Sequence, residues 1–228
     1  MPINSKDKAI ADLRQRILST EIEPGADLDE ARLSETYGIS RTPLREVLQK
    51  LAGEGFVILS PNRGAKVASM DVTTMRSFFQ TAPMIYASIA RLAASAQTGG
   101  QLTALKRVQD GFRETLSRRD SGAAALANHA FHAQIGEMAH NAYLSAALDR
   151  LLIDHTRMSQ TFYAPASDAD SALIEQAADQ HDKMIAALET KDAELIVQLT
   201  LDHWDLSRNR MEHFVRPDPL PMENANAV

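Results

Sequence analysis

The hydrophobic pattern of this 228-residue sequence changes sharply near Asp71. Before that point, apolar positions with the 3.6-residue spacing of short helices alternate with turn signals such as Glu23-Pro24-Gly25. After it, strand signals disappear and long helical stretches follow. The sequence therefore predicts two domains, residues 1–70 and 71–215, the second built of helices. The proline-rich, polar tail over 216–228 predicts disorder.

The first domain is predicted to be a winged helix-turn-helix. A short helix ends at Gly38, and Ser40 stands at the N-cap of the next helix, which has Pro43 in its first turn. Two short apolar segments over 56–60 and 65–69 then form a hairpin. In this arrangement the helix that begins near residue 41 would enter the DNA major groove.

The second domain is predicted to be an all-α, six-helix antiparallel bundle. Faces rich in alanine and leucine permit close helix packing. The six helical stretches are 72–97, 101–119, 121–139, 142–164, 170–189 and 191–214. The expected fold class is therefore mainly α, with an N-terminal winged helix-turn-helix and a C-terminal helical bundle.

Composition excludes several classes of protein. The chain has no cysteine, so it holds no disulfide scaffold, thiol nucleophile or Cys-ligated metal. No apolar run approaches the roughly 18 residues of a membrane span, and the N-terminal residues lack the apolar core of a signal peptide, so we expect a cytoplasmic protein. The net charge of −6 argues against a polyanion-binding surface over the whole protein. Residues 1–70 contain ten Lys or Arg and ten Asp or Glu, which leaves room for a local basic face.

The candidate DNA contacts gather around the predicted recognition helix. Arg41 and Arg45 are four residues apart and project from one face near its N-terminus. Arginine suits guanine O6 and N7, whereas Thr42 and free backbone N–H groups suit phosphate. Arg32 could reach the DNA backbone, and Arg63-Gly64 at the hairpin tip could enter the minor groove. Two arginines at this spacing also fit a solvated helix face; the turn before them and the hairpin after them favour DNA.

All seven histidines fall in the second domain. Asn128 and His132 share a helical face, while His181 and His203 lie within apolar stripes of two other helices. Three neutral imidazoles that converge in an interior are costly to bury unless something coordinates them or hydrogen-bonds to them. A divalent ion such as Zn²⁺ or Ni²⁺ suits imidazole ligands, and hydrogen-bonded core histidines are the alternative. The remaining histidines are assigned to surface or helix-end positions: His129, His140, His155 and His213.

An ion held by three histidines leaves coordination positions open, and a small carboxylate would fit them. A buried arginine would complete such a pocket, and Arg157 is the candidate, although a surface arginine fits its position equally well. A rival hypothesis is a metal-dependent hydrolase, with Glu137 or Asp182 as base, yet neither shares the helical face of its neighbouring histidine. A third hypothesis keeps the regulator but lets the histidines bind an anion without a metal.

The first domain contains a specific motif. It consists of Leu33-Ser-Glu-Thr-Tyr-Gly-Ile-Ser-Arg-Thr-Pro-Leu-Arg-Glu-Val-Leu, followed by Gly55-Phe-Val and Asn62-Arg-Gly. With these residues, 9–68 resemble the DNA-binding domain of GntR-family bacterial transcription regulators. The resemblance implies DNA contacts at Arg32, Arg41, Arg45 and the Gly64 region.

The second domain resembles the FCD effector domain of the FadR subfamily of these regulators. Phe131-His132, Asn141-Ala-Tyr-Leu, His181 and His203 carry the resemblance, and six helices resemble the VanR-type branch. In metal-binding members, three histidines and an acidic residue four positions before the first of them hold the ion. The resemblance therefore implies ligands at His132, His181 and His203, with Asn128 where aspartate is usual. An asparagine carbonyl can ligate but brings no negative charge.

The resemblance also implies a function. Members of the family are ligand-responsive regulators, most often repressors, that bind pseudo-palindromic operators as homodimers. The expected effector is a small organic acid bound beside the ion, and acyl-CoA is disfavoured because the histidine set belongs to the metal-binding branch. Ala82, Ile85 and Tyr86 replace the family's Arg…Leu-Glu pattern, so the identity of the effector does not transfer.

Overall fold

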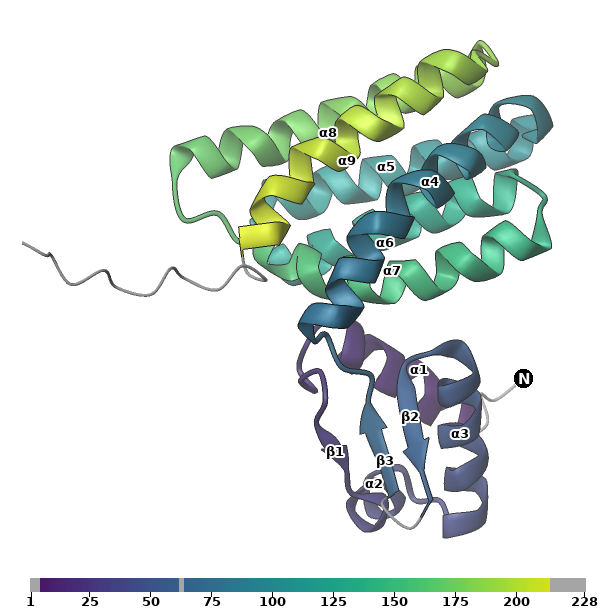
Figure 1. Ribbon diagram of the computed structural model, residues 1–228, viewed down its shortest axis with the longest axis vertical. Coiled ribbons are helices and arrows are strands. Elements are labelled where there is room, and N and C mark those ends of the chain that lie inside the picture. The colour runs from purple at the N-terminus through teal and green to yellow at the C-terminus, as the bar shows by residue number, and fades with distance from the viewer. Residues whose placement is uncertain (1–4, 62–63, 214–228) are drawn as a thin grey trace, which may run out of the picture.

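The computed structural model describes residues 5–61 and 64–213, which form a small N-terminal domain and a larger helical domain (Figure 1). The fold is mainly α, as predicted. The predicted tail over 216–228 lies outside the described residues. None of the helices within the described ranges is long and apolar enough to cross a membrane.

The N-terminal domain is a winged helix-turn-helix, which confirms the prediction. Its elements are α1 (Ser5–Leu18), β1 (Asp27–Leu28), α2 (Glu30–Tyr37), α3 (Arg41–Glu54), β2 (Val57–Ser60) and β3 (Gly64–Val67). The three strands form an antiparallel sheet in the order β1-β3-β2. The turn between α2 and α3 depends on Gly38, whose φ of 62° is the left-handed conformation that glycine adopts without strain. Apolar side chains from α1, α3 and the sheet form the core of this domain.

The helical domain contains six helices in the described part of the chain, close to the predicted bounds. They are α4 (Val72–Ala96), α5 (Gly99–Ser117), α6 (Ser121–Met138), α7 (Ala142–Phe162), α8 (Asp168–Glu189) and α9 (Ala193–His213). Side-chain caps fix five of the starts, because each accepts backbone N–H groups that have no acceptor within the helix. These N-caps are Asp71, Thr98, Asp120, Asn141 and Ser167.

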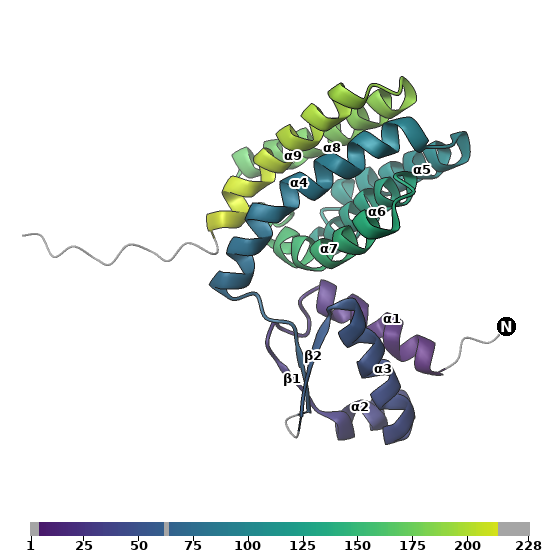
Figure 2. The same cartoon turned by 45° about the vertical axis from the view of Figure 1, so that its right-hand side comes forward.

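The helix α7 lies next to the N-terminal domain in both views of the molecule (Figures 1 and 2). Ile153 of α7 packs into the core of the N-terminal domain rather than the core of the bundle. The two domains are therefore in direct apolar contact, in addition to being joined through the segment between β3 and α4.

Candidate DNA-binding surface and metal centre

The N-terminal end of α3 is exposed to solvent. Three buried leucines and one valine hold one face of this helix in the core: Leu44, Val47, Leu48 and Leu51. The opposite face therefore presents Arg41, Thr42 and Arg45, all of which are exposed. Ser40 occupies the N-cap position, but its side chain forms no capping hydrogen bond within the described residues. The first N–H groups of the helix thus remain available to a phosphate oxygen.

A groove of about 410 Å³ separates α3 from the hairpin and is lined by Arg45, Glu30, Gln49, Ser60 and Gly64, among others. The Arg45 side chain is 71% exposed, and its Nε lies 3.8 Å from Glu30 Oε2, so the pairing is weak and easily exchanged for a DNA contact. Gly64 has a φ of 73°, and a Cβ added there would meet no atom within 4 Å outside its chain neighbours, which permits close approach of a duplex.

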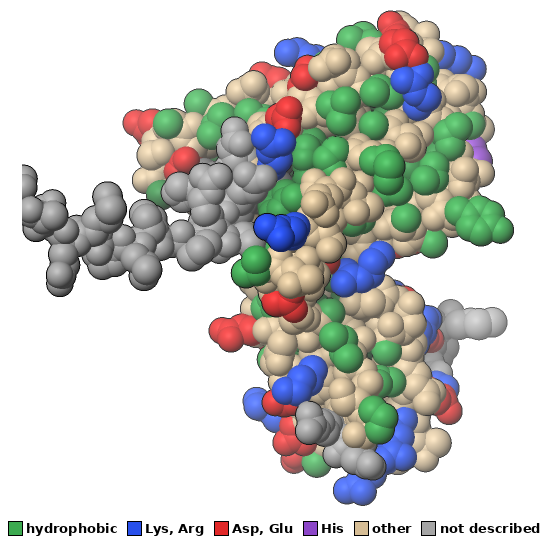
Figure 3. Space-filling view, viewed as in Figure 1, with side chains coloured by type: hydrophobic (Ala, Val, Ile, Leu, Met, Phe, Trp, Pro, Cys, Tyr) green, Lys and Arg blue, Asp and Glu red, His purple; other side chains and the backbone are tan. Residues whose placement is uncertain are grey.

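The α3 N-terminus, α2 and the hairpin lie at the end of the N-terminal domain that is farthest from the bundle (Figure 1). Lys and Arg side chains gather at this end together with acidic ones (Figure 3). Arg32 is exposed on α2. Arg63, the predicted minor-groove contact, lies outside the described residues.

The structure brings His132, His181 and His203 together from α6, α8 and α9. The three side chains are buried, and one ring nitrogen from each lies within 4.8 Å of the others. The ring centroids are 4.6 Å apart for His181 and His203, and 5.4 Å apart for the two pairs that include His132. Three nitrogens at this spacing surround a central position. A small inward movement of the rings would bring each nitrogen to the roughly 2.0–2.1 Å of a Zn–N bond from that position.

Several buried polar atoms of the predicted ligands have no hydrogen-bond partner among the described residues. They are His132 Nε2, His181 Nε2 and the Oδ1 atom of Asn128, which is also buried. A buried polar atom without a partner costs about 1–3 kcal/mol. A divalent ion between the three histidines would satisfy His132 Nε2 and His181 Nε2, and Asn128 stands one helical turn before His132 on α6, so these residues fit a divalent metal.

The protonation states also suit a metal. Burial lowers the pKa of the His132 and His181 imidazoles well below the usual value, and it lowers the pKa of His203 to about 4. The imidazoles are therefore neutral at pH 7, which is the form that binds a metal ion.

Two glutamines orient the rings. His181 Nδ1 lies 3.1 Å from Gln109 Oε1, and His203 Nδ1 lies 3.0 Å from Gln180 Oε1. An amide oxygen can only accept, so each Nδ1 carries the hydrogen and each Nε2 keeps its lone pair for a metal. Gln109 is itself fixed, because its amide nitrogen donates to the Ala178 carbonyl and to the carboxylate of Asp182.

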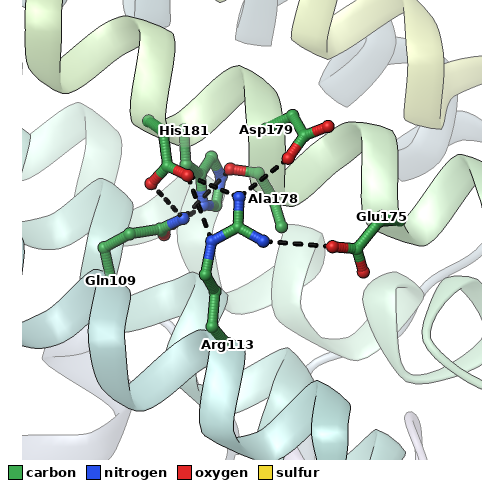
Figure 4. Close-up of polar contacts among 7 residues, drawn as sticks. Gln109, Arg113, Glu175, Ala178, Asp179 and His181 are labelled. Carbon is green, nitrogen blue, oxygen red and sulfur yellow. Dashed lines mark hydrogen bonds and ion pairs between the residues drawn. The ribbon is translucent and has the colours of Figure 1, made fainter.

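Figure 4 shows how α5 and α8 lock this arrangement. Arg113 of α5 pairs with three carboxylates of α8, those of Glu175, Asp179 and Asp182. The Asp182 carboxylate thus pairs with Arg113 and accepts a hydrogen bond from Gln109. These contacts fix Gln109, and they occupy the carboxylate that the hydrolase hypothesis requires as a base. The predicted site did not include Gln109, although the sequence carries a signal for it: Gln109 is a polar residue in the apolar stripe with Leu105 and Phe112.

The assignment of His155 to the surface was wrong. His155 is buried, its Nδ1 lies 2.7 Å from the Tyr86 hydroxyl, and its pKa is lowered to about 3 by burial. The reason is that both faces of α7 are covered. Of the other histidines, His129 is partly buried with Nδ1 2.8 Å from Thr156 Oγ1, and His140 is exposed. The His213 side chain lies outside the described residues.

Arg157 is buried as well, so the alternative of a surface arginine is wrong. Its guanidinium pairs with Asp154 and donates from Nη1 to the Ala68 carbonyl at 2.7 Å. Ala68 lies just after β3, so these contacts direct Arg157 toward the N-terminal domain.

A winged helix-turn-helix with an exposed recognition helix, joined to a helical domain with a buried histidine centre, defines a two-domain DNA-binding regulator. Comparison with known proteins agrees. Residues 5–67 match the family of bacterial regulatory proteins called gntR, and residues 80–206 match the FCD domain. The chain belongs to the GntR family of bacterial transcription regulators, and its helical domain is an FCD domain.

Individual relatives match most of the chain. The HTH-type transcriptional repressor RspR of Escherichia coli is 25% identical over 202 residues, which are 89% of this chain and 86% of RspR. The gluconate operon transcriptional repressor of Bacillus licheniformis is 22% identical over 90% of this chain and 84% of its own. The solved structure of McbR/YncC of E. coli has the same fold, with a TM-score of 0.79 and 17% identity, and covers 94% of this chain and all of that one. The families and these relatives are transcription regulators, so the hydrolase hypothesis is set aside.

Proposed function

We propose that this protein is a transcription repressor whose operator affinity is set by a small carboxylate bound next to a divalent ion, with zinc as the leading candidate. Two chains would form a homodimer in the cytoplasm and read a pseudo-palindromic operator through Arg41 and Arg45. The six-helix FCD domain supports placement in the VanR-type branch. Two of the relatives are themselves named transcriptional repressors.

The observation that carries the proposal is the buried set of orphaned ligand atoms at His132, His181 and Asn128. His203 adds a third imidazole from α9. These residues would hold the ion, which would supply a Lewis-acidic position for an anion.

The charge of the site favours an anionic ligand. The three histidines, Asn128 and the two orienting glutamines are all neutral, so a bound divalent ion would leave a buried charge of +2. A buried charge without a partner is unfavourable, and an anionic ligand offsets it. A carboxylate supplies one negative charge and an oxygen donor. Asn128 stands where the family usually has an aspartate and brings no negative charge, so this site depends more on an anionic ligand.

We expect small carboxylates to stabilise the zinc-loaded protein and not the metal-free protein. At a concentration 100 times its Kd, a carboxylate adds about 2.7 kcal/mol, or several degrees in Tm for a chain of this size. Thermal unfolding with a panel of two- to six-carbon mono- and dicarboxylates measures the effect, with zinc-loaded His140→Ala as the matched control that should respond as the wild type does. Equal shifts in metal-free protein would instead support direct binding of the anion by the histidines.

A further inference from the structure

One segment of α7 is buried on every side. Residues 152–159 are all buried, whereas a helix that packs on one side only leaves its opposite face in water. Figure 2 shows the reason, since α7 lies between the other bundle helices and the N-terminal domain. The two faces of this segment therefore contact different domains.

The first face contacts the N-terminal domain. Ile153 packs into the core of that domain. Gln160 Nε2 donates to the Leu18 carbonyl at 3.0 Å, and Arg157 Nη1 donates to the Ala68 carbonyl at 2.7 Å. The spacings of four and three residues place these three side chains on one face of the helix.

These contacts continue directly to the recognition helix. The Ala68 N–H donates to the Phe56 carbonyl at 2.9 Å, and Phe56 follows the C-terminal end of α3. Arg150 lies against Gly55, since a Cβ atom at Gly55 would lie 2.5 Å from Arg150 Cδ. One face of α7 thus fixes both the end of α3 and the segment that leads to α4.

A network of charged side chains lies at this contact between α7 and the N-terminal domain. Asp154 accepts a hydrogen bond from Arg150 at 2.9 Å and pairs with Arg157. The Arg157 side chain is fully buried, and its Nε has no partner among the described residues. A buried charge is stable only when its hydrogen bonds and ion pairs keep good geometry. A small displacement of Arg157 would therefore break its hydrogen bond to the Ala68 carbonyl.

The second face contacts the histidine centre. The Tyr86 hydroxyl lies 2.7 Å from His155 Nδ1, and the Tyr86 ring meets the His132 ring edge-on at 5.3 Å. The rings of His132 and His155 are 5.5 Å apart. Trp204, the neighbour of His203, contacts both Tyr86 and His155. A shift of His132 or of α9 would therefore displace His155 through these contacts.

We propose that α7 transmits the state of the histidine centre to the recognition helix, and that Arg157 is the positioning residue that couples them. This inference rests on the proposed function. His155 and Arg157 are two residues apart on one rigid helical turn, so a movement of His155 displaces Arg157 relative to Ala68. The position of α3 relative to the bundle then changes, and in a dimer the spacing of the two recognition helices changes with it.

The test is the ratio of two operator Kd values, one for metal-free protein and one for zinc-loaded protein. The probe is a duplex selected from a random pool by wild-type protein. We expect a wild-type ratio that departs from 1 by about 5–150-fold in either direction. Arg157→Met should bring the ratio to within twofold of 1 and leave the Kd for zinc within threefold of wild type. Arg157→Lys, which keeps one donor for Ala68, should restore part of the ratio.

The outcomes separate the two hypotheses. A merely structural arginine would weaken operator binding equally in both states, so an unchanged ratio in Arg157→Met overturns the inference. A wild-type ratio of 1 would show that metal occupancy alone does not change operator affinity and would overturn the inference, whereas the carboxylate panel tests the proposed function separately. Arg107→Met, an exposed arginine on α5, is the matched control and should keep the wild-type ratio. If Arg157→Met does not fold, Tyr86→Phe removes the contact with His155 from the other side and should also reduce the ratio.

A second readout follows domain position without DNA. The chain has no cysteine, so Lys50→Cys on α3 and Thr103→Cys on α5 give two exposed, unique labelling sites. Spin labels at these positions should report a distance change on zinc binding in the otherwise wild-type protein. The same labels in Arg157→Met should report no change, and an equal change in both proteins overturns the inference.

Discussion

The double variant Arg41→Ala, Arg45→Ala is expected to lose specific operator binding, with a fall in affinity of at least about 100-fold. Both side chains are exposed at the start of α3, and a bidentate arginine–guanine contact contributes about 1–3 kcal/mol of discrimination. Fluorescence anisotropy with a selected duplex measures the loss, and DNase footprinting shows whether the specific site is still protected.

The matched control removes two positive charges elsewhere. Arg107 and Arg118 are exposed on or next to α5, and their replacement by alanine should leave operator affinity within a few-fold of wild type. Circular dichroism, zinc content and oligomeric state should be unchanged in both double variants. An unchanged footprint with Arg41→Ala, Arg45→Ala would show that α3 is not the recognition helix.

His203→Ala is expected to lower zinc affinity by at least about 100-fold. The substitution removes one of three imidazoles that converge from α6, α8 and α9, and among the described residues no other histidine belongs to this cluster. Zinc bound to the native state alone stabilises it by mass action, so the zinc-dependent rise in Tm should also disappear. The measurements are metal analysis and calorimetry on protein purified without a histidine tag.

His140→Ala is the control for this experiment, because His140 is exposed after α6. It should retain the zinc content of the wild type. Equal zinc content in His203→Ala and wild type would place the metal somewhere other than this centre.

The sequence predicts the fold because its signals are local. Apolar periodicity places the six bundle helices within a few residues of their observed bounds. The strand β1 has only two residues, Asp27 and Leu28, and pairs with β3 through its backbone. A segment that short has no periodicity, so the sequence pattern does not predict it.

The candidate site divides in the same way. His181 and His203 occupy apolar stripes, so their burial follows from helical spacing. The burial of His155 depends on a second domain that covers α7, and no spacing along α7 reveals this. The direction of the Arg157 guanidinium likewise depends on Ala68, 89 positions away in the sequence. Contacts between domains join residues far apart in the sequence, so the spacing of residues along one helix does not reveal them.

In the proposed mechanism, occupancy of the histidine centre controls operator affinity. The decisive measurement is the Kd of wild-type protein for a selected duplex, taken in chelator and again in saturating zinc, at one salt concentration because phosphate contacts make affinity salt-dependent. We expect a change of about 5–150-fold in wild type and no change in His203→Ala. Equal Kd values for wild-type protein in the two conditions, with zinc binding verified in the same samples, would contradict the mechanism.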